Sequence, residues 1–275
     1  MNPRLLPLLL LLTGCASSAM KLDYDTPVDP VLQGRIMAID TAIRAKYAIP
    51  AEQTDVGVLD LKRGRLAMIH PDSEEYAASI AKVGILLAWF QLHPERPDPQ
   101  TRHELGLMVK ISSNEMATKF SRRIGISEVQ RVLDRYGFYD ANRGGGIWFG
   151  KHYGPNSERI GDPVANNSHA ATVRQLLRFW LLLDQGKLVS PAASNTMREI
   201  FASPDIPADA VRFVKGLEGR QLRILRKLGS WESWLHDSAL ISGPGRRYIL
   251  VGLTTNPCGD GYLEDLARAV DDLLR

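Results

Sequence analysis

Apolar positions recur along this chain with two different periods, and the period changes from one region to the next. Residues 35–47 ("RIMAIDTAIRAKY") place apolar side chains three and four positions apart, which predicts an amphipathic helix. Residues 55–61 ("DVGVLDL") and 64–70 ("GRLAMIH") flank the turn Lys62-Arg63-Gly64 and predict a β-hairpin.

The middle of the chain has the spacing of helices. Six segments separated by clusters of Pro, Gly and Asn show it: residues 80–92, 102–110, 114–124, 127–136, 170–184 and 190–201. The most apolar stretch, "RQLLRFWLLLDQG", is interrupted by Arg178 and Asp184, so it is predicted to be a buried helix and not a membrane span. The glycine-rich segment "RGGGIW" at 143–148 is predicted to be a flexible loop.

Strand patterns return near the end. Residues 222–229, 233–242 and 246–255 are β-rich, a turn at 243–246 joins the last two, and residues 262–274 predict a closing amphipathic helix. The predicted fold is α/β, an α+β sandwich. One antiparallel sheet of N- and C-terminal strands is flanked by terminal helices, and a helical subdomain is inserted in sequence. The expected lobes are 35–75 with 205–275 (α/β) and 76–204 (helical).

The N-terminus departs from this pattern. Residues 1–14 ("MNPRLLPLLLLLTG") place Arg4 before a leucine run too short to span a bilayer, which is typical of a secretion signal peptide. "LTGC" then resembles the lipobox of bacterial lipoproteins, which implies that Cys15 is acylated and becomes the new N-terminus. A plain signal peptide followed by a chance cysteine is the alternative. Residues 15–34, polar and carrying two prolines, are predicted to be a tether.

These features predict an exported protein, lipid-anchored in the cell envelope and facing the periplasm. Ala16, where aspartate would favour the inner membrane, indicates the outer membrane in a Gram-negative host. With Cys15 acylated, Cys258 is the only other cysteine, so we expect no internal disulfide and a structural role for Cys258.

Composition, charge and the absence of certain motifs exclude several classes of function. The 275 residues are 44% hydrophobic and 24% charged, which is typical of a globular domain, and the net charge is only +3. Basic residues are scattered among acidic ones, so nucleic acid is not an expected partner. The sequence has no His-Glu-x-x-His spacing, no cysteine cluster, no Gly-x-Ser-x-Gly and no phosphate-binding glycine loop. We expect no metal, no cofactor and a monomer.

A serine and a lysine stand three positions apart at the start of the apolar run "VGILLAWF". On a helix, Ser79 and Lys82 would share a face, and the apolar run would desolvate the lysine so that it can act as a base. The helix dipole and the free backbone N–H groups at a helix start would also stabilise an oxyanion. One such pair is expected by chance in a chain of this size, so alone it is more simply a coincidence.

Two further motifs change this interpretation. Ser112-x-Asn114 precedes a predicted helix, and Lys227-x-Gly229 followed by Ser230 lies on a predicted strand. The order Ser-x-x-Lys, Ser-x-Asn, Lys-x-Gly resembles class A β-lactamases and penicillin-binding proteins. Residues 55–82 also resemble the family's opening hairpin and nucleophile helix, and the resemblance extends over residues 35–275.

The resemblance implies roles for the first two motifs. Ser79 would attack the substrate carbonyl, Lys82 would be the acylation base and Ser112 would relay a proton to the leaving nitrogen. Asn114 would hold the amide side chain of the substrate. As a structural alternative, Ser112 or Asn114 would be a helix cap.

The third motif would bind the other end of the substrate. Lys227 and Ser230 would bind its carboxylate, and the backbone N–H groups of Ser79 and Ser230 would form the oxyanion hole. Gly229 would let the substrate approach the backbone. Alternatively, Lys227 would be a solvated strand residue and Gly229 an ordinary strand glycine.

The chain departs from the family at two points. The family's deacylating glutamate follows an aromatic that aligns with Trp148, but here Phe149 follows, and Glu158 is the sole carboxylate candidate for the deacylating base. The family often keeps a carboxylate-binding arginine near the positions of His236 and Asp237, and none is apparent.

The expected function is therefore that of an envelope serine hydrolase. It would form an acyl-enzyme on β-lactam or related amide or ester substrates, such as D-alanyl peptides, and release it slowly. The alternative is an envelope lipoprotein that keeps the fold as a binding module with little or no catalysis.

Overall fold

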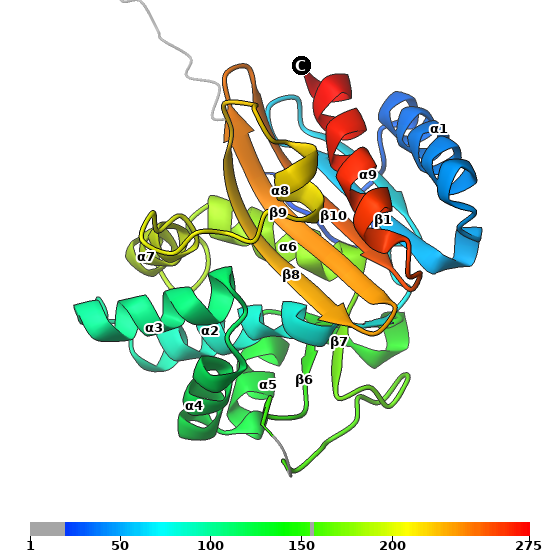
Figure 1. Ribbon diagram of the computed structural model, residues 1–275. Helices are drawn as coiled ribbons and strands as arrows, with labels where there is room; N and C mark the ends of the chain where they lie inside the picture. The colour runs from blue at the N-terminus through cyan, green and yellow to red at the C-terminus, as the bar shows by residue number, and fades with distance from the viewer. Residues whose placement is uncertain (1–19, 155–156) are drawn as a thin grey trace, which may run out of the picture.

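The computed structural model describes residues 20–154 and 157–275 (Figure 1). The predicted signal peptide at 1–14 and the predicted lipidation site Cys15 lie outside the described residues. Within the described part, no helix is long and apolar enough to cross a membrane.

A five-stranded antiparallel sheet forms the centre of the molecule, in the order β2-β1-β10-β9-β8 (Figure 1). Its strands are β1 (Thr54–Asp60), β2 (Arg65–Ile69), β8 (Arg223–Trp231), β9 (Trp234–Gly243) and β10 (Arg246–Thr254). β1 pairs with β10, so the two ends of the chain share one sheet. This confirms the predicted α/β fold, with strands from both termini in one antiparallel sheet.

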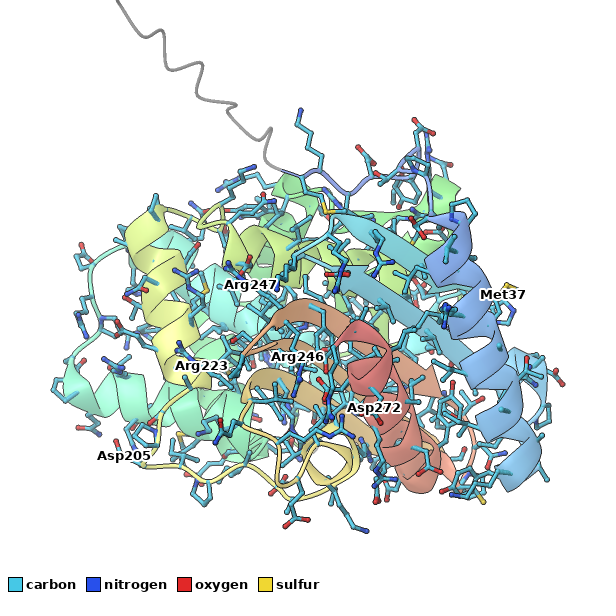
Figure 2. All side chains as sticks on the ribbon, turned by 90° about the horizontal axis from the view of Figure 1, so that it is seen from above. Met37, Asp205, Arg223, Arg246, Arg247 and Asp272 are labelled. Atoms are coloured by element: carbon cyan, nitrogen blue, oxygen red, sulfur yellow. The ribbon has the colours of Figure 1, made fainter. Side chains whose placement is uncertain are left out.

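Three helices cover one face of this sheet: α1 (Pro30–Tyr47), α8 (Arg212–Gly216) and α9 (Gly259–Leu274) (Figure 1). The opposite side of α1 is open to solvent, where Met37 points outward (Figure 2). The buried carboxylate of Asp271 joins α9 to β10, because it forms an ion pair with the Arg246 Nε at 2.7 Å and accepts a hydrogen bond from the Tyr248 hydroxyl at 3.1 Å.

The described part of the predicted tether, residues 20–34, belongs to the folded domain. Helix α1 begins at Pro30 and not at Arg35, because Asp29 caps it by accepting a hydrogen bond from the Leu32 N–H and proline suits the first helical position. The segment before it packs against the domain, where Arg174 donates to the Asp23 carbonyl oxygen.

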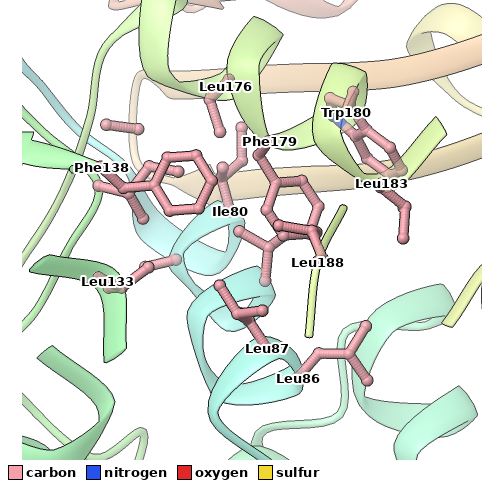
Figure 3. Close-up of a cluster of buried hydrophobic side chains, with 14 of the residues drawn as sticks. Ile80, Leu86, Leu87, Leu133, Phe138, Leu176, Phe179, Trp180, Leu183 and Leu188 are labelled. Atoms are coloured by element: carbon pink, nitrogen blue, oxygen red, sulfur yellow. The ribbon is translucent and has the colours of Figure 1, made fainter. Parts of the chain in front are cut away.

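The inserted helices form the second lobe on the other face of the sheet. They are α2 (Lys82–Leu92), α3 (Pro99–Lys110), α4 (Asn114–Ile124), α5 (Ile126–Arg135), α6 (Val173–Asp184) and α7 (Pro191–Phe201). Helix α2 is enclosed by the hydrophobic core of this lobe. Figure 3 shows Leu86 and Leu87 in the same cluster as Phe138 and Phe179. A helix enclosed in this way is apolar all round, which explains the run "VGILLAWF".

The remaining short elements include η1 (Ala51–Gln53), η2 (Ala78–Ala81) and η3 (Ala141–Arg143), which are 3-10 turns. The short strands are β3 (Glu75–Tyr76), β4 (Tyr139–Asp140), β5 (Gly145–Gly146), β6 (Trp148–Phe149) and β7 (His169–Ala171). They pair as β3-β7-β6 and β4-β5.

Two predictions fail in this region. Residues 143–148 are not a flexible loop, since β5 and β6 lie there and the Gly145 and Gly146 backbone is buried at positive φ, which glycine adopts readily. The helix predicted from residue 170 starts at Val173, because residues 170 and 171 pair with β3 and Thr172 caps α6.

Candidate active site

The first motif lies where strand β3 runs into helix α2. Ser79 is the second residue of the 3-10 turn η2, and Lys82 follows the turn directly. Side chains three positions apart are eclipsed in a 3-10 turn, and the Lys82 Nζ donates a hydrogen bond to the Ser79 Oγ at 3.0 Å. The serine and the lysine are therefore in contact, as the spacing predicts.

Lys82 is fully buried, and its amine is surrounded by oxygen acceptors. Besides Ser79, the Nζ contacts the Ser112 carbonyl oxygen at 2.5 Å, the Ser112 Oγ at 3.0 Å and the Asn114 Oδ1 at 2.7 Å. Burial lowers the pKa of Lys82 to about 7. A lysine with this pKa is partly neutral at neutral pH and has a lone pair for the serine proton.

The second motif bridges to the third through one hydroxyl. Ser112 lies between α3 and α4 at a φ of +59°, and its Oγ accepts a hydrogen bond from the Lys227 Nζ at 2.9 Å as well as from Lys82. The structural alternative of a helix cap is not observed, since Ser113 caps α4 by accepting from the Met116 N–H. Ser112 is thus free to bond both amines.

Lys227 is also fully buried, so the alternative of a solvated strand lysine is wrong. Burial and the nearby charge of Lys82 lower its pKa well below the ordinary value. Gly229 serves close packing, because a Cβ there would lie 2.6 Å from the Ala77 carbonyl oxygen. Strand β8 can therefore lie directly against the backbone that carries Ser79.

An arginine that the sequence did not reveal completes this side of the site. Arg212, at the start of α8, donates from Nη2 to the Ser230 Oγ at 2.7 Å and from Nη1 to the carbonyl oxygens of Gly229 and His236, each at 2.7 Å. The Arg212 Nε donates a hydrogen bond to the Asp260 carboxylate at 2.6 Å. The positive charge beside Ser230 thus comes from α8, and no local sequence signal links it to the motif.

His236, on the strand where the family often keeps an arginine, has a structural role. Burial lowers its pKa to about 4, so the ring is neutral. Its Nε2 donates to the Tyr76 carbonyl oxygen at 2.9 Å, and its Nδ1 accepts from the Thr254 N–H at 3.2 Å. His236 therefore ties β9 to the backbone just before the nucleophile.

One residue or more of each motif opens onto a cavity of about 210 Å³. Ser79, Asn114 and Ser230 line it from the motifs, and Tyr153 and His169 line it from the segment between α5 and α6. Among the described residues that line it there is no aspartate or glutamate. Glu158 is exposed and lies outside the lining, so the structure does not bring this candidate base to Ser79.

No group of three or more His, Cys, Asp or Glu side chains suited to a metal ion occurs within residues 20–154 and 157–275. Cys258 is an exposed free thiol, so burial does not support the expectation that it has a structural role.

A comparison with protein families matches residues 95–273 to the family described as "Beta-lactamase enzyme family". This match includes the second and third motifs, while Ser79 and Lys82 lie before it. A search of curated proteins gives no match.

Solved structures with a similar fold cover most of this chain. The β-lactamase of Sphaerobacter thermophilus DSM 20745 is 15% identical, with 86% of this chain and 95% of that chain covered at a TM-score of 0.68. PBP-A is 18% identical, with 92% and 98% covered at 0.67. A PBP-A variant solved as an acyl-enzyme complex with penicillin G is 16% identical, with 86% and 96% covered at 0.62.

Proposed function

The chain belongs to the beta-lactamase enzyme family, and on that basis we propose that it is an envelope serine hydrolase that forms an acyl-enzyme on Ser79. The observation that carries the proposal is the position of the Lys82 Nζ. This buried amine, with a pKa of about 7, lies 3.0 Å from both the Ser79 Oγ and the Ser112 Oγ. A base of this kind is what a serine needs to become a nucleophile.

The acylation step follows from these contacts. The neutral Lys82 takes the Ser79 proton while the Oγ forms a bond to the substrate carbonyl carbon and the carbonyl electron pair moves onto its oxygen. The N–H groups of Ser79 and Ser230 stabilise that oxyanion. When the tetrahedral intermediate collapses, the C–N bond breaks and Ser112 gives its proton to the leaving nitrogen. Lys82 returns a proton to Ser112 and is neutral again.

The substrate carries a carboxylate in this proposal. Arg212 bonds Ser230 and supplies a positive charge on the β8 side of the cavity, and its carboxylate partner Asp260 does not line the cavity. Lys227, whose pKa is lowered, lies behind Ser112 and can bond an anion through it. No carboxylate among the described lining residues opposes the Arg212 charge. β-Lactams and peptides that end in D-alanine both combine a reactive amide with a carboxylate.

Deacylation is slow in this proposal. A general base typically contributes about 10² to 10⁴ in rate, and Glu158 is exposed and outside the cavity lining. The acyl-enzyme therefore persists, as in a penicillin-binding protein. The acyl-enzyme captured for the similar PBP-A variant supports this comparison.

The protein acts at the cell envelope in this proposal. The lipobox-like sequence ending at Cys15 supports export and lipid anchoring, with the domain in the periplasm as a monomer. One observation favours a second function, that of a binding module with little catalysis. The same absence of a carboxylate among the described lining residues that slows release would also suit a protein that only retains its ligand.

Intact-mass analysis after incubation with a panel of penicillins and a fluorophosphonate probe tests the proposal. We expect one adduct per chain, mapped by peptide digestion to Ser79 and absent from Ser79→Ala. The control is Ser113→Ala, which removes only a helix cap, costs about 1 kcal/mol of stability and keeps the adduct. An adduct that survives in Ser79→Ala would contradict the proposal.

A further inference from the structure

The residue before the nucleophile has an unusual backbone conformation. Ala78 has a φ of +46°, in the left-handed region, which costs an L-residue roughly 1–2 kcal/mol. Such a conformation persists only where the surroundings hold it. Tyr153 does this, because its hydroxyl donates a hydrogen bond of 2.8 Å to the Ala78 carbonyl oxygen.

The Tyr153 hydroxyl is a fixed and permanent donor. Burial raises the pKa of Tyr153 well above the ordinary value, so the hydroxyl stays protonated. Its ring stacks on His169 with centroids 4.5 Å apart, and it lies over the Lys82 Nζ at 4.4 Å. His169 is held in turn, since its Nε2 bonds the Lys151 carbonyl oxygen at 2.8 Å.

The carbonyl that Tyr153 holds belongs to the same peptide group as the Ser79 N–H. In a planar trans peptide the C=O and the N–H point in opposite directions, so fixing the Ala78 oxygen fixes the direction of the Ser79 N–H. A carbonyl that accepts a hydrogen bond also makes its own amide N–H a stronger donor, by about 10–30% per bond. Tyr153 thus acts on the N–H group that faces the developing oxyanion.

We infer that Tyr153 is a positioning residue for acyl transfer, holding and polarising the 78–79 peptide that supplies one donor of the oxyanion hole. This inference rests on the proposed function, the acylation of Ser79. It adds a residue from outside the three motifs, and the residue acts through a backbone carbonyl and not on the substrate.

Tyr153→Phe tests the inference, because it removes the hydroxyl and keeps the ring over Lys82. With a chromogenic cephalosporin, we expect the acylation rate constant at saturation to fall about 5- to 30-fold, less than the 10² to 10³ lost when an oxyanion donor is removed outright. The concentration for half-saturation should change less than twofold. The midpoint of the pH profile should stay where Lys82 sets it.

Infrared difference spectra of the trapped penicillin adduct give an independent measurement. The acyl carbonyl band should move to higher wavenumber in Tyr153→Phe, because the oxyanion-hole hydrogen bond is weaker. Only protein that was folded when the penicillin was added becomes acylated and contributes to this band, so a less stable variant can still be measured. The control is Tyr136→Phe, whose hydroxyl contacts the Val189 N–H and Gln91 and does not line the cavity.

The outcomes separate the two claims. An unchanged rate constant and an unmoved band in Tyr153→Phe, with normal acylation of the wild type, would overturn the role of Tyr153 and leave the proposed function standing. If the wild type is not acylated on Ser79, the proposed function and this inference both fall. Equal losses in Tyr153→Phe and Tyr136→Phe would overturn the inference alone.

Discussion

The rate of acylation should rise about tenfold between pH 6 and pH 8. Only neutral Lys82 can accept the Ser79 proton, and burial sets its pKa at about 7. The neutral fraction is then roughly 0.1 at pH 6 and roughly 0.9 at pH 8, and the rate should reach a plateau above about pH 8. A solvated lysine would give no plateau below about pH 10.

Burial is the dominant influence on this value. Complete burial of the Lys82 amine disfavours its charged form, while acceptors such as the Ser112 carbonyl oxygen at 2.5 Å favour it. Lys227 lies on the other side of the Ser112 hydroxyl, and a charge there would further disfavour a charge on Lys82. Desolvation is the larger effect, so the pKa of Lys82 is lowered.

Stopped-flow measurement of the first turnover of a chromogenic cephalosporin, from pH 5.5 to pH 10 at constant ionic strength, tests this reasoning. Lys82→Ala should lose about 10² to 10⁴ in rate and show no inflection near pH 7. The cavity histidines should not mimic the effect, because burial lowers the pKa of His152 and brings that of His169 to about 4. A flat profile, a midpoint near pH 10, or an inflection that survives in Lys82→Ala would refute it.

Three further predictions concern other parts of the chain. Arg212→Ala should raise the half-saturating concentration of a penicillin about 10- to 100-fold but affect a neutral fluorophosphonate much less, as measured by concentration series. Glu74 has a pKa raised to about 8 by burial and its contact with Asp162, so its stabilising effect is present below about pH 4 and lost as pH rises through 8. Glu74→Gln should therefore flatten the decline of Tm with pH, although Asp55, with a pKa also near 8, keeps some slope. Cys15→Ala should move the protein from the membrane fraction to the soluble fraction or block processing, and an unmodified N-terminus elsewhere in the wild type would contradict the lipid anchor.

The sheet and the helical block could be predicted from the sequence, because each long element carries several repeats of its apolar period. The short strands could not, since two or three residues such as 145–146 or 169–171 hold no period. Asp29 is a local signal for the start of α1 at Pro30, but the polar composition of the segment also suits a tether and outweighs that signal.

The site residues also fall into those that local spacing predicts and those that only tertiary packing brings together. Ser79 and Lys82 could be predicted together because a helical turn brings residues three apart into contact, whatever the rest of the fold. Arg212 and Tyr153 could not, because each reaches the site through tertiary packing from 18 and 75 residues away. Their local sequences give no sign of it.

The lifetime of the penicillin adduct tests the central claim most directly. Wild-type protein is mixed with excess penicillin, and intact mass is recorded from seconds to hours alongside release of hydrolysed product. The account predicts a stoichiometric adduct on Ser79 within the first turnover, lasting minutes or more, followed by slow steady-state release. Rapid multiple turnover with no accumulated adduct would contradict slow deacylation, and complete absence of an adduct would contradict acylation of Ser79 itself.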